Sequence, residues 1–169
     1  MTLLRREIFA GRGIGQKRVK RASFRLRRLS GGKIYQNADS FRYLRLREAE
    51  GCCLAEDIVF LRKSASLSTL MEELIHSLQF KLKIYDSFST LYGNAAAVCL
   101  MEYQASCILV EHESLWKVPR PEREKNRKRR SGLKRIVKVA LGSSPCHSNL
   151  KLHKSKKCLA PKLAFLMGN

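Results

Sequence analysis

The chain of 169 residues carries a formal net charge of +20, and 44% of its residues are hydrophobic. That hydrophobic content is normal for a globular protein and excludes a wholly disordered chain, and no run of about 18 apolar residues predicts a membrane span. The charge is uneven, because residues 1–33 carry +10, residues 34–116 carry −4 and residues 117–169 carry +14. We therefore predict a slightly acidic folded core at 34–119, between a basic flexible arm at 1–33 and a basic tail of low order at 120–169.

The N-terminus and the cysteines bear on the cellular compartment. The first residues include Arg5 and Arg6, and no apolar stretch of the kind found in the centre of a signal peptide follows them. The sequence therefore predicts no secretory signal peptide. We expect a cytoplasmic protein, or one exported by a specialised system without a cleavable signal peptide. The cysteines are expected to be reduced, and the adjacent Cys52 and Cys53 to act as small buried hydrophobic residues.

The first elements of the core are short. Residues 41–46 predict a strand or a short helix, and the β-branched and aromatic residues of 57–61 predict a strand. A serine-rich turn at 63–68 follows this strand. Strand, turn and the helices described next predict an α+β fold.

Two helices follow the turn. Thr69 and Glu72 match a capping box, which predicts Thr69 as the N-cap of a helix that continues to about Lys83. Its apolar residues recur at helical spacing and form one stripe. After an expected loop at 85–94, residues 95–112 predict a second helix. Its apolar face consists of Val98, Met101, Ala105, Ile108 and Leu109, and it also includes Glu102.

The first helix carries a polar strip beside its apolar stripe. Glu72 and His76 are four residues apart and therefore lie on one side of the helix, and Gln79 extends the same strip. Glu73 takes the place of the general base in a His-Glu-x-x-His arrangement. In that chemistry two helix ligands and a third ligand hold Zn²⁺, an open position holds water, and the glutamate takes the proton of that water.

The second helix supplies the best candidate for a third ligand. Glu102 lies on an apolar helix face, where a carboxylate is costly unless it is paired, protonated or bound to metal. Glu111 and His112 are weaker candidates near the helix end. If Glu72, His76 and Glu102 bind one ion, we expect their ligand atoms to lie within about 4 to 5 Å of one another.

The succession of strand, serine-rich turn, Glu72-Glu73-x-x-His76-x-x-Gln79 and then Glu102-x-x-Ala105 resembles zincin-like metallopeptidase domains of bacterial polymorphic toxins and phage-associated proteins. The resemblance covers about 60 residues. It implies a small α+β core with an active-site helix behind a short sheet, zinc ligation by His76 and Glu102, and water activation by Glu73. Its departures are Glu72 at the first histidine position and Gln104 where a further acid is typical. The implied activity is a divergent zinc-dependent hydrolase acting on a protein or peptide.

Other interpretations remain open on the sequence alone. Glu72 has a complete explanation as a capping residue, and Glu73 and His76 as a solvated polar face. The domain can equally be a degenerate copy without activity. An alternative function is non-catalytic, salt-sensitive binding of nucleic acid or an acidic surface through the arms, with Arg127, Lys128, Arg129 and Arg130 as the binding residues.

Overall fold

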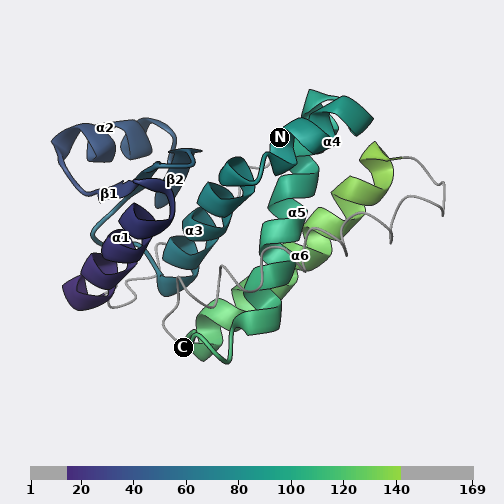
Figure 1. The fold of residues 1–169 in the computed structure, drawn as a ribbon. Coiled ribbons are helices and arrows are strands. Elements are labelled where there is room, and N and C mark those ends of the chain that lie inside the picture. The colour runs from purple at the N-terminus through teal and green to yellow at the C-terminus, as the bar shows by residue number, and fades with distance from the viewer. Residues whose placement is uncertain (1–14, 142–169) are drawn as a thin grey trace.

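The computed structural model describes residues 15–141 of the chain, with a small sheet at one side of the molecule and a group of packed helices at the other (Figure 1). The elements are α1 Gln16–Ser30, β1 Lys33–Tyr35, α2 Ala38–Leu46, β2 Gly51–Ala55, β3 Ile58–Leu61, α3 Leu67–Lys81, α4 Ile84–Tyr92, α5 Asn94–His112 and α6 Arg120–Ala140. The expected α+β class is confirmed. No helix within these residues is long and apolar enough to cross a membrane.

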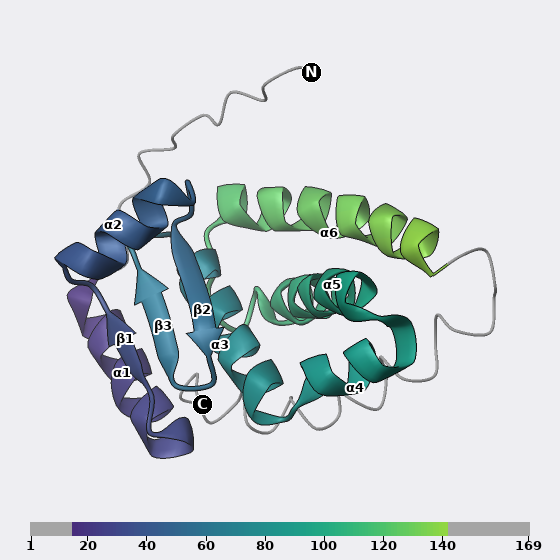
Figure 2. The same ribbon diagram turned by 90° about the horizontal axis from the view of Figure 1, so that it is seen from above.

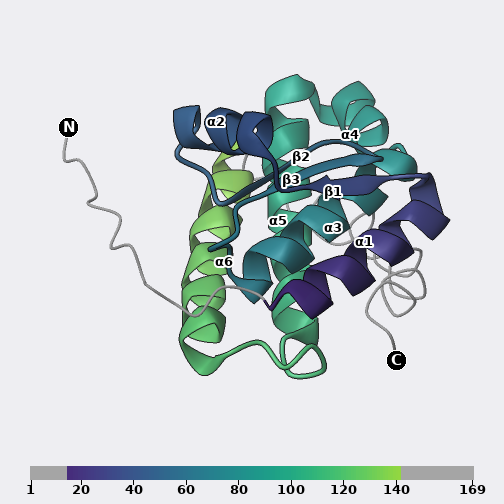
Figure 3. The ribbon, with the colours of Figure 1, turned by 90° about the vertical axis from the view of Figure 1, so that its left-hand side faces the viewer.

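The sheet has three strands in the order β1-β3-β2, with β1 parallel and β2 antiparallel to the central strand β3. One face of the sheet carries α2 and the other carries α1 and α3 (Figure 3). Val59 and Leu61 of β3 point into the core and are fully buried. Within residues 15–141, strand β2 therefore has one edge without a strand partner.

Helix α3 lies between the sheet and α5 and is buried on nearly all sides (Figure 2). Its first turn is capped by Ser66, whose hydroxyl accepts a hydrogen bond of 3.1 Å from the amide of Thr69. The predicted capping box is therefore wrong, because the N-cap is Ser66, three residues before Thr69, and the helix begins at Leu67. Glu72 lies in the second turn and has no capping role.

Parts of both predicted arms are helical, which corrects their expected low order. Helix α1 buries Val19, Ala22 and Leu26 beside the sheet, since these residues recur at three- and four-residue spacing and leave the basic residues outside. Helix α6 packs along α5. The rest of the predicted arms, residues 1–14 and 142–169, lies outside the described residues. The expected loop at 85–94 is also mostly helix, because α4 buries Ile84 and Phe88 one turn apart.

Two sets of polar contacts hold the first half of α6 against the neighbouring helices. Glu122 accepts hydrogen bonds from the amide (2.9 Å) and hydroxyl (2.8 Å) of Ser68 at the start of α3, and Asn126 donates to the same hydroxyl. Arg127 forms an ion pair with the buried Glu113, which follows α5 directly. Helix α6 is thus tied to both α3 and α5.

Candidate metal centre

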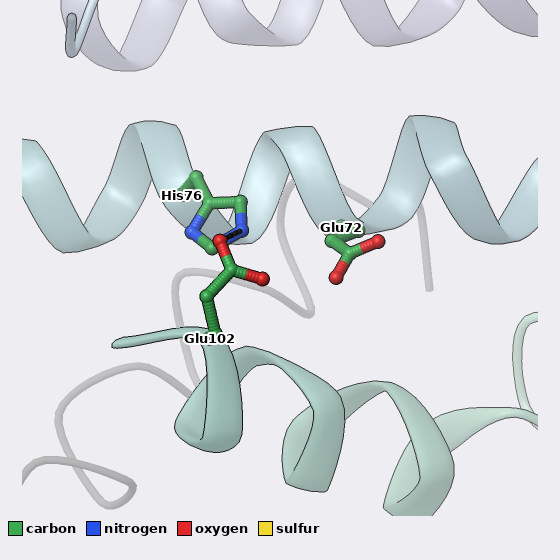
Figure 4. A group of neighbouring side chains, drawn as sticks. All are labelled: Glu72, His76 and Glu102. Atoms are coloured by element: carbon green, nitrogen blue, oxygen red, sulfur yellow. Dashed lines mark ion pairs between the residues drawn. The ribbon is translucent and has the colours of Figure 1, made fainter. Parts of the chain in front are cut away.

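Glu72 and His76 of α3 face Glu102 of α5 across the interface between the two helices (Figure 4). One ligand atom from each of the three residues lies within 4.8 Å of the other two, which is close enough to bind a metal ion. Nε2 of His76 is 3.5 Å from Oε1 of Glu102. Ligands at 2.0–2.2 Å around a tetrahedral ion are about 3.3–3.6 Å apart, so this pair needs no movement to share an ion.

Burial separates this group from an ordinary polar helix face. Glu72 is only 8% exposed and His76 only 9%, and the side chain of Glu102 is 34% exposed. Charged side chains are rarely buried unless they are paired or bound to metal. The solvated-face interpretation of Glu73 and His76 is therefore wrong for this structure.

Gln79 fixes the ring of His76. The amide nitrogen of Gln79 donates to the carbonyl of Met101 at 3.0 Å and to Oε1 of Gln104 at 2.7 Å. Its oxygen therefore faces Nδ1 of His76, at 2.7 Å, and must accept from it. With Nδ1 protonated, the lone pair of the neutral ring is on Nε2, which is the nitrogen that faces Glu102.

Glu73 lies on the side of α3 that packs against β2. Its carboxyl group accepts a backbone hydrogen bond from Cys53, and burial raises its pKa from 4.5 to about 7, with a smaller opposing effect of His76. A side chain at Gly51 would place its Cβ 2.9 Å from Cγ of Glu73. The same Cβ would lie 2.8 Å from Cγ2 of Thr69, so a larger residue than glycine at position 51 would force the side chains of α3 to shift. With a pKa of about 7, the carboxyl group of Glu73 can exchange a proton near neutral pH.

A cavity of about 480 Å³ opens beside the ligand group. Its lining comprises β2 residues Gly51, Cys52 and Cys53, the acidic and basic groups Glu72, Glu73, His76, Glu102 and Arg129, and the apolar side chains Phe80, Tyr85, Val98 and Met101. Cys52 and Cys53 are half-buried at its wall, whereas we expected them to be buried. Burial raises the pKa of both thiols, so they stay protonated and are poor metal ligands.

Arg129 completes the group from α6. Its guanidinium donates to Oε2 of Glu72 at 2.5 Å and to Oε2 of Glu102 at 2.7 Å. Although burial lowers it, the two carboxylates hold the pKa of Arg129 above its ordinary value. The sequence pattern groups this residue with Arg127, Lys128 and Arg130 for nucleic-acid binding, whereas the structure pairs both Arg127 and Arg129 with carboxylates.

The three predicted ligands and the predicted base are brought together, whereas the weaker candidates are not part of the group. Glu111 and His112 lie more than two turns further along α5, and the ring of His112 is 5.3 Å from that of Trp116. The site residues that the sequence pattern does not reveal are Arg129 and Gly51. Comparison of the chain with protein-family models, with curated proteins and with solved structures finds no match.

Proposed function

We propose that Glu72, His76 and Glu102 bind a zinc ion and that Glu73 activates a water molecule there for hydrolysis of a peptide bond. The observation that carries the proposal is the convergence of three ligand atoms within 4.8 Å at a buried helix interface. Two carboxylates and one imidazole are ligands that zinc accepts, and three protein ligands leave an open position for water. A bound zinc ion would lower the pKa of that water to about 7 and polarise a substrate carbonyl.

The surrounding side chains support the roles of a ligand and a base. Gln79 keeps Nε2 of His76 free as an electron-pair donor, as hydrogen-bond partners of histidine ligands commonly do. Glu73 is the neighbour of Glu72 in sequence, lines the same cavity and has a pKa raised to about 7. A base with a pKa near the working pH is suited to accept a proton from water and pass it on.

The walls of the cavity favour a peptide over a small polar substrate. One wall is the edge strand β2, along which an extended chain can align. The lining also includes the largely apolar side chains Phe80, Tyr85, Val98 and Met101. We therefore expect cleavage next to an apolar side chain. The motif of α3 resembles zincin-like domains of bacterial polymorphic toxins, and membership of that class is part of our proposal. It is consistent with a protein substrate.

The metal is tested before the reaction. The full-length wild-type protein, prepared without chelators, is expected to contain one zinc ion per chain by elemental analysis, and His76→Ala is expected to lose it. His112→Ala removes a histidine of the same helix pair outside the group and should keep the metal. Wild-type protein without zinc, or equal zinc in His76→Ala, would refute the proposed centre.

The reaction is tested with Glu73→Gln. This variant keeps all three ligands, so it should bind zinc as the wild type does. Hydrolysis of a library of apolar-flanked peptides should fall by about 10²–10⁴-fold, since the positioned proton acceptor is gone. Equal hydrolysis by the variant and the wild type would exclude Glu73 as the base.

A further inference from the structure

Among residues 15–141, Arg129 is the one arginine or lysine that lines the cavity, and it contacts two proposed ligands at once. One of its terminal nitrogens donates a hydrogen bond to an oxygen of Glu72, and the other donates to an oxygen of Glu102. A guanidinium group is planar and presents its donors at fixed spacing, so such a bridge sets the distance and orientation of the two carboxylates.

The bridge leaves one oxygen of each carboxylate for another partner. Oε1 of Glu72 is buried and has no hydrogen-bond partner within residues 15–141. Oε1 of Glu102 faces Nε2 of His76 at 3.5 Å. A buried carboxylate oxygen without a donor is unfavourable, and a cation bound here would satisfy it. The two carboxylates also exceed the single guanidinium charge, so a cation is favoured by charge even while Arg129 stays in place.

We propose that Arg129 is a positioning residue of the metal centre, holding one oxygen of each carboxylate ligand while the remaining oxygens and Nε2 of His76 bind the ion. The inference rests on the proposed zinc site and extends it to α6. Carboxylate ligands of metals are generally hydrogen-bonded in turn by such outer residues. Here the outer residue joins both carboxylates and brings a positive charge to the wall of the cavity.

The attachment of α6 supports a fixed position for Arg129. Glu122 and Asn126 bind Ser68 at the start of α3, and Arg127 binds Glu113 just after α5. The helix that carries Arg129 is thus tied to each of the two helices that carry ligands. If a metal ion displaced Arg129 together with its backbone, this segment of α6 would have to move. The contacts of Glu122, Asn126 and Arg127, all within two turns of Arg129, oppose such a movement.

The experiment measures the affinity of the full-length protein for Zn²⁺ in competition with a chromophoric chelator. Removal of Arg129 in Arg129→Gln is expected to weaken binding by about 10–100-fold, the usual effect of losing an outer partner. Lys128→Gln removes the same charge from the neighbouring exposed position and should change the affinity less than twofold. Arg129→Lys keeps the charge but holds one oxygen at a time, so it should fall between the wild type and Arg129→Gln.

The visible absorption of the Co²⁺-substituted proteins gives a second readout. Arg129→Gln should alter the Co²⁺ spectrum because the carboxylates change orientation, whereas Lys128→Gln should not. Equal zinc binding by Arg129→Gln would mean that the arginine does not position the ligands, and tighter binding would mean that it competes with the metal. Either result would overturn the inference. If Arg129→Gln is unfolded by circular dichroism, an unchanged affinity of Arg129→Lys overturns it. If the wild type binds no zinc, the proposed metal centre itself is refuted. If the wild type binds zinc and Arg129→Gln binds it with the same affinity, only the role of Arg129 is refuted.

Discussion

Replacing Glu73 by glutamine should make the metal-free protein more stable at high pH and leave its stability at low pH unchanged. Glu73 is 8% exposed, and burial raises its pKa from 4.5 to about 7. Glutamine has nearly the same shape but cannot ionise. The substitution therefore removes the cost of burying a charge and little else.

The sign and size follow from the two pKa values. Below pH 4.5 the carboxyl group is protonated in both the folded and the unfolded protein, so it contributes no difference. Between pH 4.5 and 7 the unfolded chain loses the proton first, and the free energy of unfolding falls as the pH rises. Above pH 7 the cost is complete, and the shift from 4.5 to about 7 corresponds to about 3 kcal/mol. Glu73→Gln should recover up to this amount at pH 8.

The assay is urea unfolding at pH 4, 6 and 8 with a chelator present, comparing Glu73→Gln with the wild type. Glu124→Gln is the control, because Glu124 is 60% exposed and pairs only with an exposed arginine one turn away. The difference between Glu73→Gln and the wild type should grow with pH, and that of the control should stay within about 0.5 kcal/mol. A difference that is constant from pH 4 to pH 8 would show that Glu73 is not desolvated.

Two further substitutions test the geometry around the site. Gly51→Ala should destabilise the protein by about 1–3 kcal/mol in urea unfolding, because the new Cβ would lie 2.9 Å from Cγ of Glu73. Gly132→Ala, where α6 leaves open space, should stabilise it by up to about 1 kcal/mol, and equal effects at the two positions would contradict the close approach of β2. Gln79→Met should cost about 1–3 kcal/mol and free Nδ1 of His76, so that ¹⁵N NMR changes from one ring tautomer to a mixture. A single unchanged tautomer would mean that Gln79 does not fix the ring.

The two central helices and the ligand group can be predicted from the sequence because local patterns determine them. Helical spacing places Glu72 and His76 on one side of α3 whatever surrounds the helix. The conflict between Glu102 and its apolar helix face indicates a partner from the residue pattern alone, and the fold supplies two, His76 and Arg129. The capping box is misassigned because both Ser66 and Thr69 precede apolar residues, and the pattern does not choose between two nearby hydroxyl side chains.

The remaining parts depend on contacts that no local pattern contains. Helix α4 buries only Ile84 and Phe88, too few apolar residues to stand out from a loop. Gly51 is favoured because a Cβ there would contact the side chains of Thr69 and Glu73 on α3 at less than 3 Å. Arg129 contacts Glu72 and Glu102 from 57 and 27 residues away in the chain. In sequence it is one of several basic residues in succession, and nothing distinguishes it from its neighbours.

The basic character of residues 120–140 consequently has two components. Arg127 and Arg129 neutralise carboxylates that would otherwise be buried without a cation, so their charge belongs to the folding of the core. Lys128 and Lys134 of the same helix are exposed, and neither pairs with a carboxylate among residues 15–141. A net charge of +20 therefore overstates the surface available to polyanions. The negative charge of the proposed metal centre, conversely, is partly balanced by Arg129, so α6 has to be counted as part of the domain.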